Sequence, residues 1–174
     1  LIYASCSGFG QTGELSKKPA YDLIVQALGG IMSLTGYENQ EPVRVGTSIG
    51  DITAGLFTTI GIQAALIKRS ITNKGCHIDI SMLDCQVAIL ENAVSRYFCE
   101  KKIPKKLGSR HPSIAPFECY KCKDNYIAVA AGNNVLFNRL CESLANKNLQ
   151  NLNIFKTNDL RLTNAVKLKK MIEN

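Results

Sequence analysis

The pattern of hydrophobic and polar positions predicts alternating strands and helices in the first hundred residues. Residues 1–4 form an apolar run typical of a strand, and 76–81 alternate apolar with polar side chains, as a half-buried strand does. Between them, 14–36 carry apolar residues at helical spacing, and 51–69 are apolar nearly all round, which predicts a buried helix. The helically spaced set is Tyr21, Ile24, Val25 and Leu28. This order of elements indicates an α/β layer arrangement.

A polar pair marks the start of a further helix. Ser81 followed by Asp84 resembles a capping box, which predicts a helix over 82–102. The elements expected after it are a hairpin within 117–131, a helix over 134–145, a loop over 146–158 and a helix from Asp159 onward.

Basic residues suggest where the chain divides. The stretch "KKIPKKLGSR" contains Pro104 and Gly108 but no aromatic residue, so it is typical of a solvated linker rather than a nucleic-acid surface. We expect one domain over 1–100, a basic linker over 101–115 and part of a smaller α+β domain over 116–174. A start without methionine and an end inside a helical pattern lead us to expect an internal fragment of a longer protein.

Composition narrows the environment and the ligands. With 45% apolar and 20% charged residues in 174, a packed core is feasible, and the net charge of +7 permits an anionic ligand. No long uncharged apolar run or signal-peptide pattern stands out, so we expect no membrane partner. Seven cysteines without a framework spacing suit a reducing compartment, and the lone pair Cys119 and Cys122 lacks further ligands for a metal. We therefore expect no metal and a cytoplasmic location, or the mitochondrial matrix in a eukaryote.

The opening segment contains Gly8-Phe9-Gly10-Gln11-Thr12-Gly13, which spells G-x-G-x-x-G. A dinucleotide-binding loop needs a helix at its third glycine and an acidic residue about 20 positions later. Here 14–19 are a poor helix start and no acid lies near position 33. We interpret the segment as a strand-end turn whose glycines let the backbone approach a ligand.

Asp51 stands at the expected start of the apolar helix, in "VGTSIGDITAGLF". Its carboxylate could cap that helix, which is a favoured role for aspartate. The same position also suits a nucleophile, because aspartate is ionised at neutral pH and has glycines nearby. The pattern leaves both roles open.

Six ordered motifs resemble the class III CoA-transferases, the group of formyl-CoA transferase and carnitine CoA-transferase. These motifs are "YASCSGFGQTG", "KPAYDLIVQALGG", "TGYENQEPVRVG", "GDITAGLFTTIGIQAAL", "GCHIDISMLD" and "GSRHPSIAPFECYKCKDNYIAVAAGNN". The chain is most similar to the branch that uses succinyl-CoA and glutarate or another dicarboxylate. The resemblance implies a Rossmann-like large-domain portion, a truncated small domain and, at full length, an interlocked homodimer.

The resemblance also implies a mechanism. Asp51 would attack an acyl-CoA thioester to give an aspartyl anhydride, and the released thiolate would return to form an aspartyl-CoA thioester that the acceptor acid opens. The family's active-site loop falls on Gly8, Phe9, Gly10 and Gln11, whose backbone N–H groups would stabilise the oxyanion. The implied partners are acyl-CoA and a small carboxylic acid, with CoA a substrate and no cofactor.

Further substrate-binding positions follow from the resemblance and from charge. Arg44 matches the glutarate-type pattern and would hold the far carboxylate of a dicarboxylate, since arginine binds carboxylates with two parallel hydrogen bonds. Arg110 and His111 begin the smaller domain, and Tyr21 and Asp22 occupy a family active-site motif; all four are candidate substrate-binding residues.

The chain departs from parts of the family. The racemase branch, which epimerises 2-methylacyl-CoA, has an acid/base histidine where Tyr21 stands, and a tyrosine is a poor base at neutral pH. Formyl-CoA transferase has a lysine where Ser7 stands, and its long glycine-rich insert is missing here. CoA transfer is therefore our prediction, and the alternatives are a 2-methylacyl-CoA racemase and an inactive fragment that lacks its CoA pocket.

Overall fold

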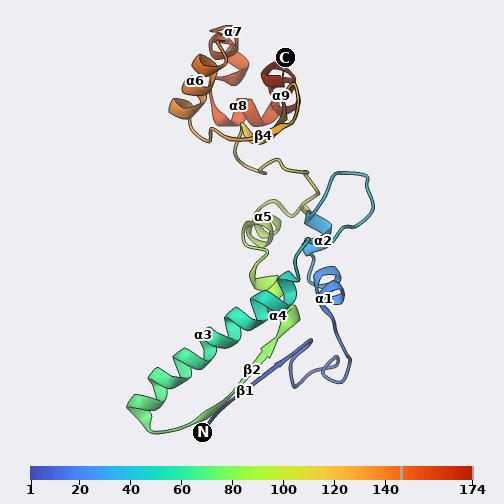
Figure 1. The fold of residues 1–174 in the computed structure, drawn as a ribbon, viewed down its shortest axis with the longest axis vertical. Coiled ribbons are helices and arrows are strands. Elements are labelled where there is room, and N and C mark those ends of the chain that lie inside the picture. Colours follow the sequence, from blue (N-terminus) through green and yellow to red (C-terminus); the bar gives the residue numbers. More distant parts are fainter. Residues whose placement is uncertain (146, 174) are drawn as a thin grey trace. The chain divides into compact units, whose positions relative to one another are not determined.

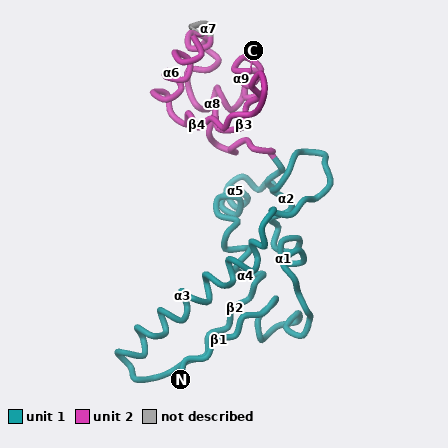
Figure 2. Tube along the Cα trace, in the orientation of Figure 1, with its two compact units in different colours: residues 1–106 teal, residues 107–174 magenta. Residues whose placement is uncertain are grey.

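The structure is a computed structural model that describes residues 1–145 and 147–173. The chain separates into two compact units, residues 1–106 and residues 107–174 (Figures 1 and 2). Both contain helices and short strands, so the expected α/β class is confirmed.

The division falls inside the basic stretch 101–115. Its first part is fastened to the first unit: the Lys105 ammonium lies 3.0 Å from the Glu38 carboxylate, and Lys106 donates to the backbone oxygen of Glu41 at 2.8 Å. Both lysines therefore act within the first unit rather than in a free linker.

The first unit is built on two parallel strands. Strand β1 (Ile2–Ser7) pairs with β2 (Cys76–Ser81) from Ile2 opposite Cys76 to Ser7 opposite Ser81. Helix α3 (Ile49–Thr72) connects back to β2 and packs on both strands (Figure 1). Both predicted strands are confirmed, and β2 has the half-buried alternation expected of it.

Short helices precede α3. Helix α1 (Asp22–Leu28) covers most of the periodic set, and α2 (Ile31–Leu34) is a single turn. Gly30, with a φ of +89°, separates them in a conformation that favours glycine. The helical stretch predicted within 14–36 is therefore divided at Gly29 and Gly30.

The predicted helix over 82–102 is wrong as one element. It is two helices, α4 (Met82–Ala88) and α5 (Asn92–Glu100), because Glu91 has a φ of +52° and cannot continue a right-handed helix. Its predicted start is confirmed, since the Ser81 hydroxyl accepts the N–H of Asp84 at 3.2 Å.

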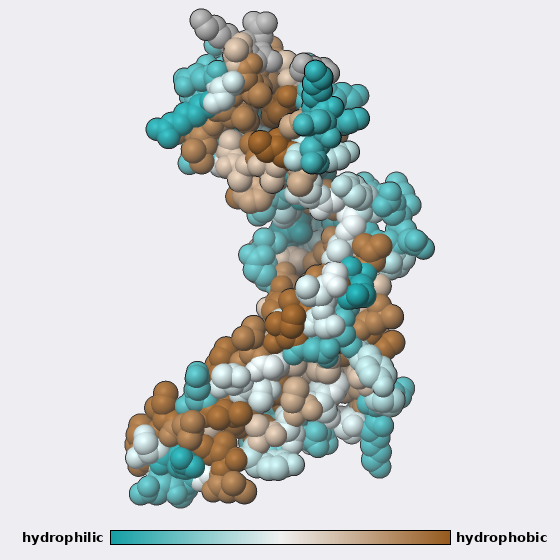
Figure 3. Space-filling model, in the orientation of Figure 1, coloured by the Kyte–Doolittle hydropathy of each residue, from teal (hydrophilic) through white to brown (hydrophobic). Residues whose placement is uncertain are grey.

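The expectation of a buried α3 is also wrong. The helix begins at Ile49 and ends at Thr72, and much of its apolar surface faces solvent, as the brown side chains over it show (Figure 3). Among the described residues it is the one helix long and apolar enough to cross a membrane, although a core helix passes the same test. The opposite side of α3 packs on β1, β2, α1 and α4. The apolar surface is exposed because these elements cover only one side of the helix.

The second unit combines a hairpin with helices. Strands β3 (Phe117–Lys121) and β4 (Tyr126–Ala130) pair antiparallel, which confirms the predicted hairpin. The helices are α6 (Asn134–Ser143), α7 (Lys147–Asn151), a 3₁₀ turn η1 (Asn153–Phe155), α8 (Asn158–Thr163) and α9 (Ala165–Glu173).

Two predictions for this unit are corrected. The expected loop over 146–158 contains α7 and η1 instead; its residue 146 lies outside the described residues. Burial of Leu149 and Phe155 in the core orders this polar segment. The expected single last helix is interrupted at Asn164, which caps the end of α8 by donating its backbone N–H to the Leu160 carbonyl at 3.1 Å.

Candidate active site

Asp51 is the third residue of α3, and its side chain is exposed. The N-cap position belongs to Ser48, so the capping role considered for Asp51 is wrong. Among residues 1–145 and 147–173, the Asp51 carboxylate has no hydrogen bond or ion pair. The carboxylate is therefore free to react with something outside the chain.

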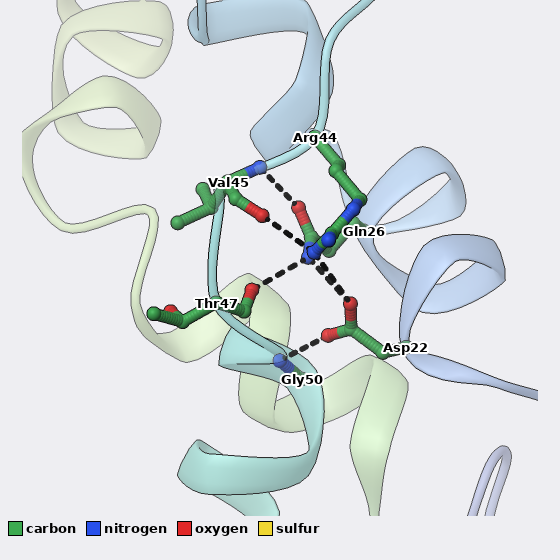
Figure 4. Close-up of polar contacts among 6 residues, drawn as sticks. All are labelled: Asp22, Gln26, Arg44, Val45, Thr47 and Gly50. Atoms are coloured by element: carbon green, nitrogen blue, oxygen red, sulfur yellow. Dashed lines mark hydrogen bonds and ion pairs between the residues drawn. The ribbon is translucent and has the colours of Figure 1, made fainter.

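The first turn of α3 is capped from another helix. Asp22, the first residue of α1, accepts the backbone N–H of Gly50 through Oδ1 at 2.8 Å (Figure 4). Ser48 makes no side-chain capping bond of its own. A carboxylate at a helix N-terminus also meets the positive end of the helix dipole. Asp22 thus supplies, from 28 positions earlier, the stabilisation that a local cap normally gives.

The absence of a side chain at Gly50 makes this contact possible. A Cβ added there would lie 2.7 Å from Cγ2 of Val25 and 3.0 Å from Oδ1 of Asp22. Val25 is fully buried, so it has no open space to move into. Glycine at this position therefore sets how closely α1 approaches the start of α3.

Gln26 ties the segment before α3 to the same carboxylate. Its side chain is fully buried; Nε2 donates to Oδ2 of Asp22 at 2.7 Å and to the Thr47 carbonyl at 3.4 Å, and Oε1 accepts the Val45 N–H at 2.8 Å (Figure 4). These bonds hold the chain immediately before the helix as well as the helix itself.

Arg44 lies at the open side of this network. Its Nη1 donates to the Val45 carbonyl at 3.0 Å and lies 4.0 Å from Oδ2 of Asp22, while 47% of its side chain is exposed. Part of the guanidinium thus remains accessible to an anion. The structure brings Arg44 and Asp22 together, next to the turn that carries Asp51.

The glycine loop follows β1 without a helix, as predicted. Gly10 is buried with a φ of +81°, and Gln11 donates its backbone N–H to Oδ2 of Asp79 at 2.8 Å. The Gln11 N–H is therefore already used. Among the described residues, the N–H groups of Gly8, Phe9 and Gly10 have no partner, so they remain as candidate oxyanion donors of the loop.

A cavity of about 230 Å³ is lined in part by Asp79, the residue that accepts the Gln11 N–H. Its lining residues are Phe57, Asp79, Ile80, Ser81, Asp84, Cys85 and Ala88. Burial, with smaller contributions from Cys6 and Asp84, raises the pKa of the Cys85 thiol, which disfavours the thiolate.

No group of three metal-ligating side chains occurs within the described ranges.

The other predicted substrate residues donate and accept no hydrogen bond of this network within the described part of the chain. Tyr21, at the N-cap of α1, is 81% exposed. Arg110 and His111 belong to the second unit, where the His111 ring packs on Phe117 with 5.1 Å between ring centroids, and its Nδ1 faces the N–H of Ser113. Their substrate-binding roles stay predictions.

Sequence reasoning missed Gln26 and Asp79. Gln26 had a detectable signal: it stands four residues after Asp22, so the two share one face of the predicted helix with buried Val25. Asp79 had none, because its position in an alternating strand indicates only that it faces away from the apolar side.

Comparison with known proteins agrees with the resemblance seen in the motifs. The sequence model "CoA-transferase family III" matches residues 1–174. Acetyl-CoA:oxalate CoA-transferase of Acetobacter aceti is 44% identical over 99% of this chain and 45% of its own length. Succinyl-CoA:glutarate CoA-transferase of Homo sapiens is 40% identical over 99% of this chain and 39% of its own length.

Solved structures show the same fold. A CAIB/BAIF family protein from Brucella suis superposes with a TM-score of 0.83 at 40% identity, covering 99% of this chain and 46% of its own. Rv3272 from Mycobacterium tuberculosis, at 20% identity, matches the fold with a TM-score of 0.85, over 99% of this chain and 44% of its own. The chain therefore spans less than half the length of these relatives.

Proposed function

The chain belongs to CoA-transferase family III, and we propose that the complete protein moves CoA from an acyl-CoA to a short dicarboxylic acid, with Asp51 as the nucleophile. The observation that carries this proposal is the state of Asp51. Its carboxylate is exposed and makes no bond with any described residue, although it sits in a turn that is otherwise held by hydrogen bonds.

The proposed reaction forms and breaks one bond at each step. An oxygen of Asp51 attacks the thioester carbonyl of the donor, and the C–S bond breaks to leave an aspartyl anhydride and CoA thiolate. The thiolate then attacks the carbonyl of Asp51, which releases the donor acid and leaves an aspartyl-CoA thioester. The acceptor carboxylate then attacks the aspartyl-CoA thioester, which gives a new anhydride and CoA thiolate. The thiolate attacks the acceptor carbonyl of that anhydride, which forms the acceptor CoA ester and restores the Asp51 carboxylate. The overall reaction takes up and releases no proton.

The glycine loop is the proposed oxyanion site. The free N–H groups of Phe9 and Gly10 can donate to the oxygen that becomes negative during attack on the thioester. Asp79 supports this role indirectly, because it holds the neighbouring Gln11 N–H at 2.8 Å and so fixes the loop.

A dicarboxylic acceptor fits both the cation near Asp51 and the names of the relatives. Arg44 keeps an exposed guanidinium near the start of α3, where it can hold the carboxylate that does not react. Two relatives are named for oxalate and glutarate, which both carry two carboxylates.

The test is acyl exchange in the complete protein. Succinyl-CoA and acetyl-CoA are offered with oxalate, succinate, glutarate and a monocarboxylic acid, and new CoA esters are measured by mass. We expect dicarboxyl-CoA products from the wild type, none from Asp51→Asn, and a CoA adduct on the peptide that contains Asp51. Asp159→Asn is the matched control, since Asp159 is also an exposed acid in the first turn of a helix. Equal activity of Asp51→Asn and the control would exclude Asp51 as the nucleophile.

A further inference from the structure

We propose that Asp22 and Gln26 form a clamp that positions Asp51, rather than part of the surface that touches substrate. The inference rests on the proposed function, since it assigns a role within that reaction. It starts from the buried polar contacts between α1 and the first turn of α3 (Figure 4).

Both oxygens of Asp22 are occupied within the chain. Oδ1 accepts the Gly50 N–H at 2.8 Å and Oδ2 accepts Nε2 of Gln26 at 2.7 Å, and only 11% of the side chain is exposed. A carboxylate held in this way has little capacity to bind a substrate. It does fix the peptide group directly before Asp51.

The orientation of the Gln26 amide is determined by its surroundings. Its Oε1 faces the Val45 N–H at 2.8 Å, and its Nε2 faces the Thr47 carbonyl at 3.4 Å. Turning the amide over would set a donor against the Val45 N–H. Nε2 must therefore point to Asp22, and residue 22 must offer an acceptor there.

This requirement explains why a carboxylate is needed at position 22. An asparagine could accept from Gly50 with its oxygen, but its NH₂ group would then face the NH₂ group of Gln26. One of the two bonds would be lost, and the first turn of α3 would be held less firmly. A displacement of about 1 Å at a reacting group lowers rates by about 100-fold.

The same geometry offers a rescue. In the double variant Asp22→Asn with Gln26→Glu, the asparagine oxygen still accepts from Gly50 and its NH₂ donates to the new carboxylate. The other oxygen of that carboxylate still accepts from Val45. The number of buried negative charges is unchanged. The long contact to Thr47 is lost, as is the 4.0 Å ion pair between Arg44 and residue 22.

The experiment measures kcat, KM and backbone amide exchange in the complete protein. We expect Asp22→Asn to lose about 100-fold in kcat, with KM for donor and acceptor unchanged and with faster exchange over residues 48–53. The double variant should recover most of the kcat and the slow exchange. Circular dichroism at the assay temperature shows whether each variant is folded, so that a loss of kcat is assigned only to folded protein.

Other results would overturn the inference. Wild-type kcat in Asp22→Asn would do so, as would a raised KM for the acceptor without rescue by the double variant, because that result is typical of a substrate contact. If the wild type transfers no CoA, the proposed function fails separately. The exchange data then decide on the clamp, and unchanged exchange in Asp22→Asn would refute it.

Discussion

Replacing Gly50 with alanine should destabilise α3 although alanine normally favours a helix. The new methyl group would lie 2.7 Å from Cγ2 of Val25 and 3.0 Å from Oδ1 of Asp22. Gly55, in the same helix, has no atom within 4 Å of an added Cβ, so Gly55→Ala is a matched control. The pair separates the contact between helices from helix propensity.

The magnitude follows from these distances. Carbon atoms in contact prefer a separation of about 3.5–4.0 Å, so α1 and α3 must separate by about 1 Å or compress Val25. Compression of a packed core costs about 1–3 kcal/mol, and separation breaks the bond from Gly50 to the Asp22 carboxylate, worth about 1.5–3 kcal/mol. Gly55→Ala should instead gain about 0.8–1.0 kcal/mol. Because alanine gains this propensity at both positions, the two variants should differ by the cost of the contact, about 1–3 kcal/mol in the stability of α3.

Amide hydrogen exchange of α3 in the complete protein measures this difference. Exchange reports the free energy of local opening, so the result does not depend on the second unit. We expect faster exchange in Gly50→Ala and slower exchange in Gly55→Ala than in the wild type. Equal stabilisation by both alanines would refute the reasoning, because it would mean that α1 does not contact Gly50 in solution.

Two further predictions concern the second unit. Arg161 is fully buried and donates to the Ala115 carbonyl at 2.7 Å. Arg161→Met leaves buried acceptors unpaired, so it should lower the free energy of unfolding in urea by about 3 kcal/mol or more. The exposed control Arg139→Met should change that free energy by at most about 0.5 kcal/mol, and similar values for both variants would contradict the prediction. Stability should also fall in alkali, because burial raises the pKa of the Cys141 thiol above 9.0 and that of the Tyr120 hydroxyl above 10.0. Both groups are neutral when folded, so their contribution is complete at neutral pH and decreases progressively as the pH rises above about 9. Circular dichroism of the second unit's unfolding between pH 7 and 11 checks this, and constant or rising stability would contradict it.

Local patterns carried enough information to predict most elements. The alternation in 76–81 and the Ser81 cap depend on residues a few positions apart, and both are present as predicted. The failures have causes that periodicity does not report, one local and one tertiary. The break at Glu91 is a single positive φ, and the ordering of 147–155 comes from the burial of Leu149 and Phe155 in a core that residues far along the chain complete.

The candidate site divides in the same way. The sequence alone indicated that Asp51 lies near the start of an apolar helix after a glycine turn, although the helix begins two residues earlier, at Ile49. It left open whether Asp51 is a cap or a nucleophile. The tertiary structure decided against the cap, because α3 begins at Ile49 with Ser48 at its N-cap. Its first turn is held instead by Asp22, which accepts the Gly50 N–H at 2.8 Å and comes from 28 positions away through the packing of α1 on α3. Helical and strand periods arise from neighbours along the chain, whereas a cap supplied by another helix depends on close packing of distant segments.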